Sequence, residues 1–210
     1  MKKVICFSLG YSSSAALIQE DGKILKAISE ERLTRVKEDK KFPINAIRFC
    51  LKNINYKDID GICYSNYEID NFKTLIKRYF LEEEIKDILS ICKTNDFKSF
   101  VQKLFIREFG LYKSIYRIEH HFSHALSTFV PSPFNEKNTL IITADGFGDN
   151  FSATVNVIKD DRVERNITFS QDNKSSLGLI FQYTTEAIGY RPHRDEYKLT
   201  ALEIYSKNIS

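Results

Sequence analysis

The stretch Ser14–Ile24, SAALIQEDGKI, recurs in outline at Ser152–Val163, SATVNVIKDDRV. In each copy a β-rich run ends in a short turn of charged residues, which is the pattern of a tight hairpin. A β-rich run also precedes each copy, at Lys3–Leu9 and at Asn138–Ala144, and a third run follows each turn. The sequence therefore predicts the same three-stranded antiparallel meander twice, as a repeat of architecture more than of identity.

Helical patterns follow the first meander. Asn45–Asn53 has apolar residues at mostly helical spacing behind Pro43, and Ile59–Ser65 has the composition of a short buried strand. Residues 68–109 predict two or three amphipathic helices, which we interpret as an inserted helical layer. Tyr116–Val130 then passes from a short strand into a helix that ends before two prolines.

The repeated order of strand, glycine turn, strand, hairpin, strand and helix indicates an α/β protein with a duplicated RNase H-like fold, the superfold of actin, Hsp70 and the sugar kinases. We expect a complete first RNase H-like subdomain over residues 1–137, with the helical insertion at about 68–109. Residues 138–210 would begin a second, truncated one, because only Ser176–Ile188 and a tail from Glu196 follow its meander as helices. Each glycine turn is where such folds bring backbone amides towards a phosphate.

Composition narrows the functional classes. The 210 residues are 42% hydrophobic and include 16 Phe, enough for a sizeable core. The 31 basic and 28 acidic residues are interspersed, which argues against binding to nucleic acid or to a membrane surface. No run has the apolar length of a membrane span. The four cysteines lie far apart without a CxxC pair, which indicates reduced core residues of a cytoplasmic protein.

The sharpest chemical feature is a histidine pair. His120 and His124 lie one helical turn apart, and three of the four histidines fall within this five-residue window. Asp145 follows an apolar strand, at the sheet edge where ligands of α/β folds gather. Two imidazoles and a carboxylate suit a divalent first-row metal, with iron, zinc and manganese as candidates. The alternative is a buried histidine beside a solvated one and an ordinary Asp-Gly turn. Asp149 offers a weaker second carboxylate.

Two charged segments offer donors for an anion. Arg35 and Lys37 in EERLTRVK (Glu30–Lys37) suit a phosphate or carboxylate, and Lys198 in DEYKL (Asp195–Leu199) suits a phosphate. Both segments equally fit ordinary solvated helix starts, and spacing leaves the choice open. The sequence has no GxSxG, Walker A, HExxH or Cys-His nucleophile pattern.

Taken in order, five segments of the chain resemble the carbamoyltransferase family of antibiotic and nodulation-factor biosynthesis, relatives of the enzyme that places threonylcarbamoyl on tRNA. The segments are SAALIQEDGKILKAISEERLTRVKEDKKFP (Ser14–Pro43), HHFSHALSTFVPSPF (His120–Phe134), ITADGFGDNFSATV (Ile142–Val155), SLGLIFQYTTEAIGY (Ser176–Tyr190) and DEYKL (Asp195–Leu199). Five ordered motifs are far more specific than any one of them.

The resemblance implies a reaction. A carbamoyl adenylate, made from carbamoyl phosphate and ATP in a separate carboxyl-terminal domain, would pass its carbamoyl group to the hydroxyl of a small acceptor in the amino-terminal domain. A metal, with iron as first choice, would polarise the phosphate or carbamoyl oxygen. By the same match the metal ligands would be His120, His124 and Asp145. The nucleotide cofactor would lie against Gly146, Gly148, Ser176, Gly178 and Lys198, and the substrate against Tyr11, Ser12, Arg35 and Lys37.

The sequence departs from the family pattern in two places. Tyr11 and Ser12 stand where the family has a His-Asp pair, and DEYKL continues as TALEIYSKNIS (Thr200–Ser210) where the family has Met-Gly-Leu-Ala. We therefore expect a chain that needs a complementary carboxyl-terminal subunit, or self-association, before it can act. Two alternatives remain: a non-catalytic module that binds a metal or nucleotide, and a kinase-like or phosphatase-like protein that uses ATP without a carbamoyl donor.

Overall fold

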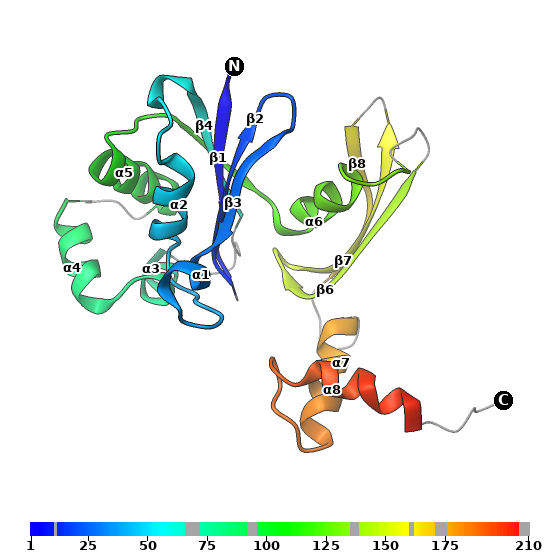
Figure 1. Ribbon diagram of the computed structural model, residues 1–210. Coiled ribbons are helices and arrows are strands. Elements are labelled where there is room, and N and C mark those ends of the chain that lie inside the picture. Colours follow the sequence, from blue (N-terminus) through cyan, green and yellow to red (C-terminus); the bar gives the residue numbers. More distant parts are fainter. Residues whose placement is uncertain are drawn as a thin grey trace. The chain divides into compact units, whose positions relative to one another are not determined.

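The computed structural model describes residues 1–10, 12–65, 72–91, 96–134, 139–159, 162–170 and 176–205. The chain divides into two compact units, Met1–Glu119 and His120–Ser210 (Figure 1). The sequence pattern placed the division between residues 137 and 138. The helix that carries the histidine cluster packs on the second sheet, and so it belongs to the second unit.

The first unit is built on a five-stranded mixed sheet. Strands β1 (Lys3–Ser8), β2 (Ser14–Gln19) and β3 (Ile24–Ser29) form the predicted antiparallel meander. Strands β4 (Ile59–Ser65) and β5 (Ser114–Ile118) extend it in parallel, giving the order β3-β2-β1-β4-β5. A sheet of this order with β2 antiparallel to its neighbours is RNase H-like, so the predicted fold class is confirmed.

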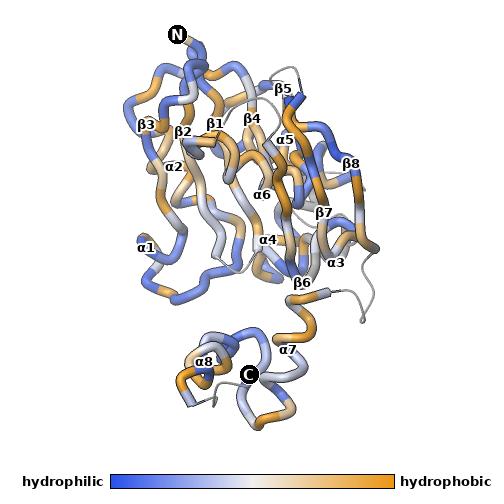
Figure 2. The backbone as a smooth tube through the Cα atoms, turned by 90° about the vertical axis from the view of Figure 1, so that its right-hand side faces the viewer, coloured by the Kyte–Doolittle hydropathy of each residue, from blue (hydrophilic) through white to orange (hydrophobic). Residues whose placement is uncertain are grey.

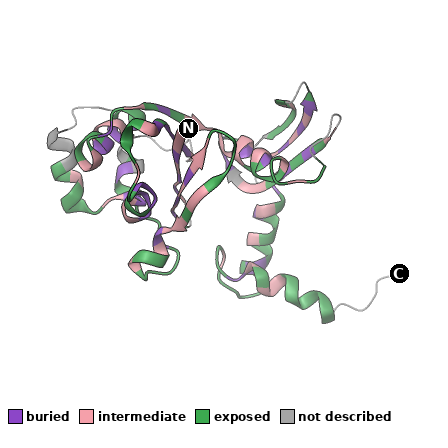
Figure 3. Cartoon of the chain, turned by 45° about the horizontal axis from the view of Figure 1, so that its top comes forward, coloured by how far each residue is buried: buried purple, intermediate pink, exposed green. Residues whose placement is uncertain are grey.

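Helices cover one face of this sheet. Alternate residues along the strands point to that face, and Ile5, Phe7 and Leu17 are almost completely inaccessible to solvent. Buried residues are purple in Figure 3. They form one apolar cluster with α2 (Ile44–Leu51) and α5 (Phe97–Phe109). The remaining helical elements of the unit are α1 (Glu30–Thr34), η1 (Tyr56–Asp58), α3 (Phe72–Tyr79) and α4 (Glu82–Ile91). Helices α3, α4 and α5 lie within the predicted insertion, whose residues 68–71 and 92–95 are outside the described ranges.

A buried carboxylate holds the start of α2. Glu30 is 2% exposed, and its oxygens accept hydrogen bonds from the backbone N–H of Asn45 (3.2 Å) and of Ala46 (2.7 Å) and from the Asn45 side chain (2.7 Å). The first amide groups of a helix have no partner inside the helix, and they favour a negative charge. The acidic start of EERLTRVK therefore has a structural role in joining β3 to α2.

The second unit contains the second predicted meander. Strands β6 (Leu140–Gly148), β7 (Phe151–Lys159) and β8 (Arg162–Ser170) form an antiparallel sheet, and α6 (His120–Phe129) packs on one face of it. Helix α7 (Leu177–Ala187) follows, with a hydrophobic first turn that is orange in Figure 2. The described chain ends with α8 (Glu196–Ala201) and η2 (Leu202–Tyr205). Among the helices described in either unit, none is both long enough and apolar enough to cross a membrane.

The β6–β7 connection differs from the predicted glycine turn. DGFGDN was expected to form the turn, whereas β6 continues through Gly148, which pairs with Phe151. The turn consists of Asp149 and Asn150, whose φ angles are +48° and +68°. Two left-handed residues match the twist of a tight hairpin, and Asp and Asn tolerate that conformation better than most residues do. Asp145 thus lies inside β6, next to an irregularity in the strand register.

The two faces of the second sheet have an unusual distribution of polarity. On β7, three of the four buried residues facing α6 are polar: Ser152, Thr154 and Asn156 are at most 1% exposed, and the fourth is Ile158. The opposite face, which we call the outer face, is apolar. Its exposed members are Leu140 (57%), Ile142 (66%), Ile167 (51%) and Phe169 (45%). The packing of α6 therefore combines buried polar contacts with a small apolar cluster, while apolar surface on the outer face remains open to solvent.

Candidate metal centre

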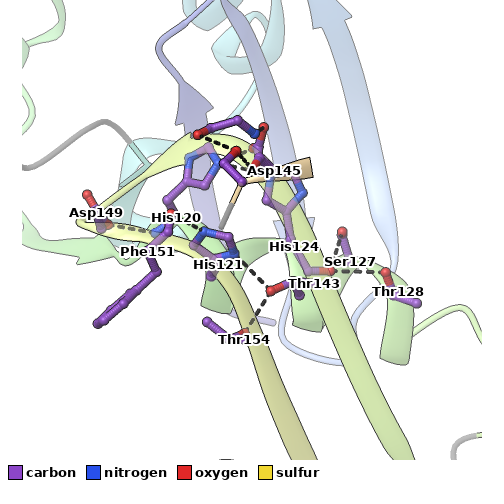
Figure 4. A network of polar contacts seen from close by, with 12 residues as sticks. His120, His121, His124, Ser127, Thr128, Thr143, Asp145, Asp149, Phe151 and Thr154 are labelled. Carbon is purple, nitrogen blue, oxygen red and sulfur yellow. Dashed lines mark hydrogen bonds and ion pairs between the residues drawn. The ribbon is translucent and has the colours of Figure 1, made fainter. Parts of the chain in front are cut away.

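Three side chains converge at the start of α6. His120 and His124 come from successive turns of α6, and Asp145 comes from the adjacent strand β6 (Figure 4). Asp145 Oδ2 lies 2.7 Å from His120 Nε2 and 3.2 Å from His124 Nε2, and the two Nε2 atoms are 3.1 Å apart. The structure therefore brings together the three residues that the sequence predicted as metal ligands.

Hydrogen bonds alone cannot satisfy this triangle of atoms. If both Nε2 atoms carry a proton, both can donate to Asp145, but two N–H groups then face each other across 3.1 Å. If one Nε2 is unprotonated, its lone pair faces the carboxylate oxygen of Asp145, which only accepts. A cation at the centre removes the conflict, because all three lone pairs can then point at it.

The spacing also fits one ion. Ligand atoms held at about 2.0–2.2 Å from a metal lie about 2.8–3.6 Å apart at octahedral or tetrahedral angles. The observed separations of 2.7, 3.1 and 3.2 Å are close to this range. The His120 side chain is 16% exposed and the His124 side chain is 52% exposed, so one side of the cluster is open. Three protein ligands with an open side are typical of sites that also admit water or substrate.

The electrostatics of Asp145 suit a ligand. Partial burial acts to raise the pKa of this carboxyl, but hydrogen bonds from His120, from His124 and from the Gly146 backbone N–H (2.6 Å) act against it. Their combined effect holds the pKa of Asp145 well below its ordinary value. The carboxylate is therefore ionised at neutral and mildly acidic pH, as metal binding requires.

The tip of the β6–β7 hairpin positions His120. A Cβ atom on Gly148 would lie 2.2 Å from His120 Cδ2, so the imidazole occupies space that any other residue would fill. Asp149, which is 3% exposed, accepts a hydrogen bond from the His120 backbone N–H (2.8 Å). Asp149 thus satisfies a backbone amide at the start of α6 that has no partner within the helix. The sequence suggested that Asp149 is a weaker second carboxylate ligand, and that role stays a prediction.

The residues predicted to bind the nucleotide cofactor lie partly beside this cluster. The Ser176 hydroxyl is 3.0 and 3.1 Å from the carbonyl oxygens of Asp145 and Gly146, and it accepts from the Leu179 N–H at the start of α7. A Cβ on Gly178 would lie 2.5 Å from Gly146 N, so α7 touches the backbone of β6. Glycine at 148 and 178 therefore has a packing reason, and cofactor binding stays a prediction.

Lys198 belongs to a different part of the second unit. It lies on α8, where its ammonium group is 3.1 Å from Asp195 Oδ1 and 5.2 Å from the centre of the Tyr190 ring. Asp195 also binds Arg191, with Nε to Oδ2 at 2.9 Å. The DEYKL segment thus forms an ion-paired helix start in this structure.

The residues predicted to bind the substrate lie in the first unit. Ser12, Arg35 and Lys37 are exposed, and Tyr11 is outside the described residues. The two loops that carry them meet, because Ser13 N–H donates to the Asp39 carbonyl oxygen (3.0 Å). The structure thus brings Ser12 near the loop of Arg35 and Lys37, within one unit.

Sequence reasoning missed the supporting residues of the cluster. The roles of Gly148 and Asp149 depend on the hairpin geometry, which no spacing rule revealed. His121 was counted as part of the cluster, yet it is fully buried and turns towards the sheet. Its position next to His120 on a helix was an available signal, since neighbouring helical residues point in different directions.

Comparison with known proteins gives several relatives. The chain is 34% identical over 197 residues to the nodulation protein NolNO of Sinorhizobium fredii (strain NBRC 101917 / NGR234), covering 91% of this chain and 27% of that protein. It is 30% identical over 220 residues to the uncharacterized protein sll1178 of Synechocystis, covering 99% of this chain and 35% of that protein. The chain thus spans about a third of the length of these curated relatives.

Solved structures resemble the chain more weakly. YeaZ from Pseudomonas aeruginosa matches with a TM-score of 0.44 and 10% identity, covering 84% of this chain and 70% of that one. The ROK hexokinase from Thermus thermophilus matches with a TM-score of 0.49 and 12% identity, covering 98% of this chain and 70% of that one.

The family model described as Carbamoyltransferase N-terminus matches residues 4–208. The chain therefore belongs to the carbamoyltransferase family, whose amino-terminal region it represents.

Proposed function

We propose that the chain is the metal-binding, amino-terminal part of a carbamoyltransferase that transfers a carbamoyl group from a carbamoyl adenylate to the hydroxyl of a small acceptor. Family membership supports the transfer, and one observation supports the metal. Two imidazole nitrogens and a carboxylate oxygen meet within 3.2 Å of one another in an arrangement that hydrogen bonds cannot satisfy.

Each residue of the site has a proposed task. His120, His124 and Asp145 would hold a divalent ion, iron in the first instance, with zinc and manganese as alternatives. When bound, the ion supplies Lewis acidity that polarises a phosphate or carbamoyl oxygen. The chain's own contribution is to hold three ligand atoms in one place and to leave the side of His124 open to the acceptor.

The cofactor and substrate sites are proposed from the family. The adenylate would lie against Gly146, Gly148, Ser176, Gly178 and Lys198, and the acceptor against Tyr11, Ser12, Arg35 and Lys37. Because the chain spans about a third of its relatives, carbamoyl phosphate and ATP would be processed by a complementary carboxyl-terminal part. Cys6, Cys50 and Cys63 have free thiols, as expected in the reducing cytoplasm, where we place the protein.

A second candidate is a non-catalytic binding module. Tyr11 and Ser12 replace the His-Asp pair of the family, so a group that orients the acceptor or accepts its proton is missing from the first hairpin. Such a module would keep the metal and lose the transfer. Metal retention together with failure of transfer, in the presence of a complete adenylate-forming domain, would favour this candidate.

Equilibrium dialysis tests the site itself. The purified chain is dialysed separately against iron(II), zinc(II) and manganese(II), alongside His120→Ala, His124→Ala and Asp145→Asn. We expect about one equivalent of metal in the wild type. Loss of any ligand should weaken binding by more than about 100-fold, since even residues behind metal ligands contribute 10- to 100-fold.

The matched control is His193→Asn. His193 is the fourth histidine of the chain, it is exposed, and its φ of +62° is one that asparagine tolerates. This variant should bind metal as the wild type does. Unchanged binding in the His120→Ala/His124→Ala double variant would remove the proposed site.

A further inference from the structure

We propose that His121 is a positioning residue for the metal centre: its buried imidazole fixes the rotation of α6 on the second sheet, so that His120 and His124 meet Asp145. The inference rests on the proposed metal site and extends it to a residue that touches no ligand atom. It starts from the unusual polarity of the covered face of the sheet, where a helix would ordinarily pack on apolar side chains.

His121 makes two directional contacts with two different strands. Its side chain is fully buried and turns away from the metal cluster towards the sheet (Figure 4). Nε2 lies 2.9 Å from the Phe151 carbonyl oxygen on β7, and Nδ1 lies 2.8 Å from Thr143 Oγ1 on β6. A carbonyl oxygen only accepts, so Nε2 donates this bond, and in the neutral ring Nδ1 accepts from the Thr143 hydroxyl.

The contacts continue as a buried chain of hydrogen bonds. Asn156 Nδ2 donates to Thr154 Oγ1 (2.9 Å), and Thr154 Oγ1 lies 2.7 Å from Thr143 Oγ1. Asn156 is the donor at one end of the chain of bonds, and His121 is the acceptor at the other. The Thr154 hydroxyl therefore donates to Thr143 Oγ1, and the Thr143 hydroxyl donates to His121 Nδ1. All of these side chains are 6% exposed or less. The network therefore specifies one position for the imidazole ring.

This network and the nearby apolar packing constrain α6 differently. Ala125 packs with Ile141 and Ile158 in a small apolar cluster, and the hydrophobic effect that stabilises such a cluster has no direction. Buried hydrogen bonds do have a direction, and a polar group left without its partner is costly in a low-dielectric interior. A small rotation of α6 would break both His121 contacts, and it would carry His120 and His124 away from Asp145.

Cobalt(II) binding distinguishes positioning from general stability. Cobalt(II) replaces the native metal because its visible absorption reports ligand geometry. The variants are His121→Phe, which removes both contacts, Thr143→Val, which removes one, and His121→Gln, which restores a donor and an acceptor. The control is Ile158→Ala, which removes packing from the same helix–sheet interface and leaves the network intact. Thermal midpoints are measured for every variant.

We expect His121→Phe and Thr143→Val to weaken cobalt(II) binding by about 10- to 100-fold, the usual effect of groups behind metal ligands. Their cobalt(II) spectra should also change, and His121→Gln should recover part of the affinity. Ile158→Ala should lower the thermal midpoint yet keep both affinity and spectrum. Wild-type affinity and spectrum in His121→Phe and Thr143→Val, or equal losses in Ile158→Ala, would overturn the positioning role alone. Absence of cobalt(II) binding by the wild type would instead overturn the metal site.

Discussion

At the scale of single residues, Gly148 makes room for the imidazole of His120. A methyl group at this position would lie 2.2 Å from His120 Cδ2 and 2.8 Å from Cγ, and contacts this short require movement. We expect Gly148→Ala to displace the His120 imidazole and to weaken metal binding by about tenfold or more, as lost ligand support does. Competition with a chelating dye measures the change.

The matched control for Gly148→Ala is two residues away on the same strand. At Gly146 the closest atom to an added Cβ is Gly178 C at 3.9 Å, which is ordinary contact distance. Gly146→Ala should therefore keep the metal affinity of the wild type. Equal losses in both variants would mean that any side chain on this hairpin disturbs the site, and that the His120 contact is not the reason.

The sequence made the three clustered residues easier to predict than their support. His120, His124 and Asp145 were recognisable because two histidines stood one helical turn apart and the aspartate followed an apolar strand. The space beside His120 was not, since it depends on where the strand ends and the hairpin turns. Glycines 146, 148 and 178 were assigned to a cofactor, and the structure adds a packing reason for two of them without testing that assignment.

At the scale of elements, the join between β3 and α2 depends on one buried carboxylate. Glu30→Ala would leave the first amides of α2 without a partner away from water. We expect a loss of about 1–3 kcal/mol in the free energy of unfolding, the usual cost of an unsatisfied buried polar group. Glu30→Gln keeps the shape and one accepting oxygen, so its loss should be smaller. Urea denaturation followed by circular dichroism gives both values.

Glu20→Gln provides the matched control for this carboxylate. Glu20 is exposed and binds only the start of the chain through the Lys2 backbone N–H (3.0 Å). Its effect should stay within about 0.5 kcal/mol, as for most surface substitutions. A loss in Glu30→Ala no larger than that of the control would show that α2 does not need the cap.

Elements were predictable where the pattern was local. Both meanders, the strand β4 and the helix behind Pro43 follow from alternation and turn residues, and the structure confirms them. The DGFGDN segment was predicted as a glycine turn, but only Asp149 and Asn150 form the turn, because Gly148 still pairs with Phe151. The register between β6 and β7 decides where the strand ends, and this register is a non-local property.

At the scale of the whole molecule, the outer face of the second sheet is the surface through which we expect the chain to associate. Leu140, Ile142, Ile167 and Phe169 are exposed apolar residues on one face of one sheet. Exposed apolar surface of this kind favours association. We expect the chain alone to self-associate at micromolar concentration, with sedimentation velocity showing species heavier than a monomer.

Charge on the outer face should reverse this association. Ile142→Lys should shift the chain towards monomer, whereas Tyr112→Lys, which changes an even more exposed apolar residue of the first unit, should not. A monomeric wild type, or the same effect from both variants, would contradict a role of the outer face. Addition of the carboxyl-terminal part of a family member should compete with self-association if both use this surface.

Anomalous scattering from crystals of the iron(II)-loaded chain locates the ion relative to the three side chains. We expect a single strong peak at about 2.0–2.3 Å from Nε2 of His120, Nε2 of His124 and a carboxylate oxygen of Asp145. A peak bound elsewhere, or these side chains turned to different places with no peak among them, would contradict the proposed metal site.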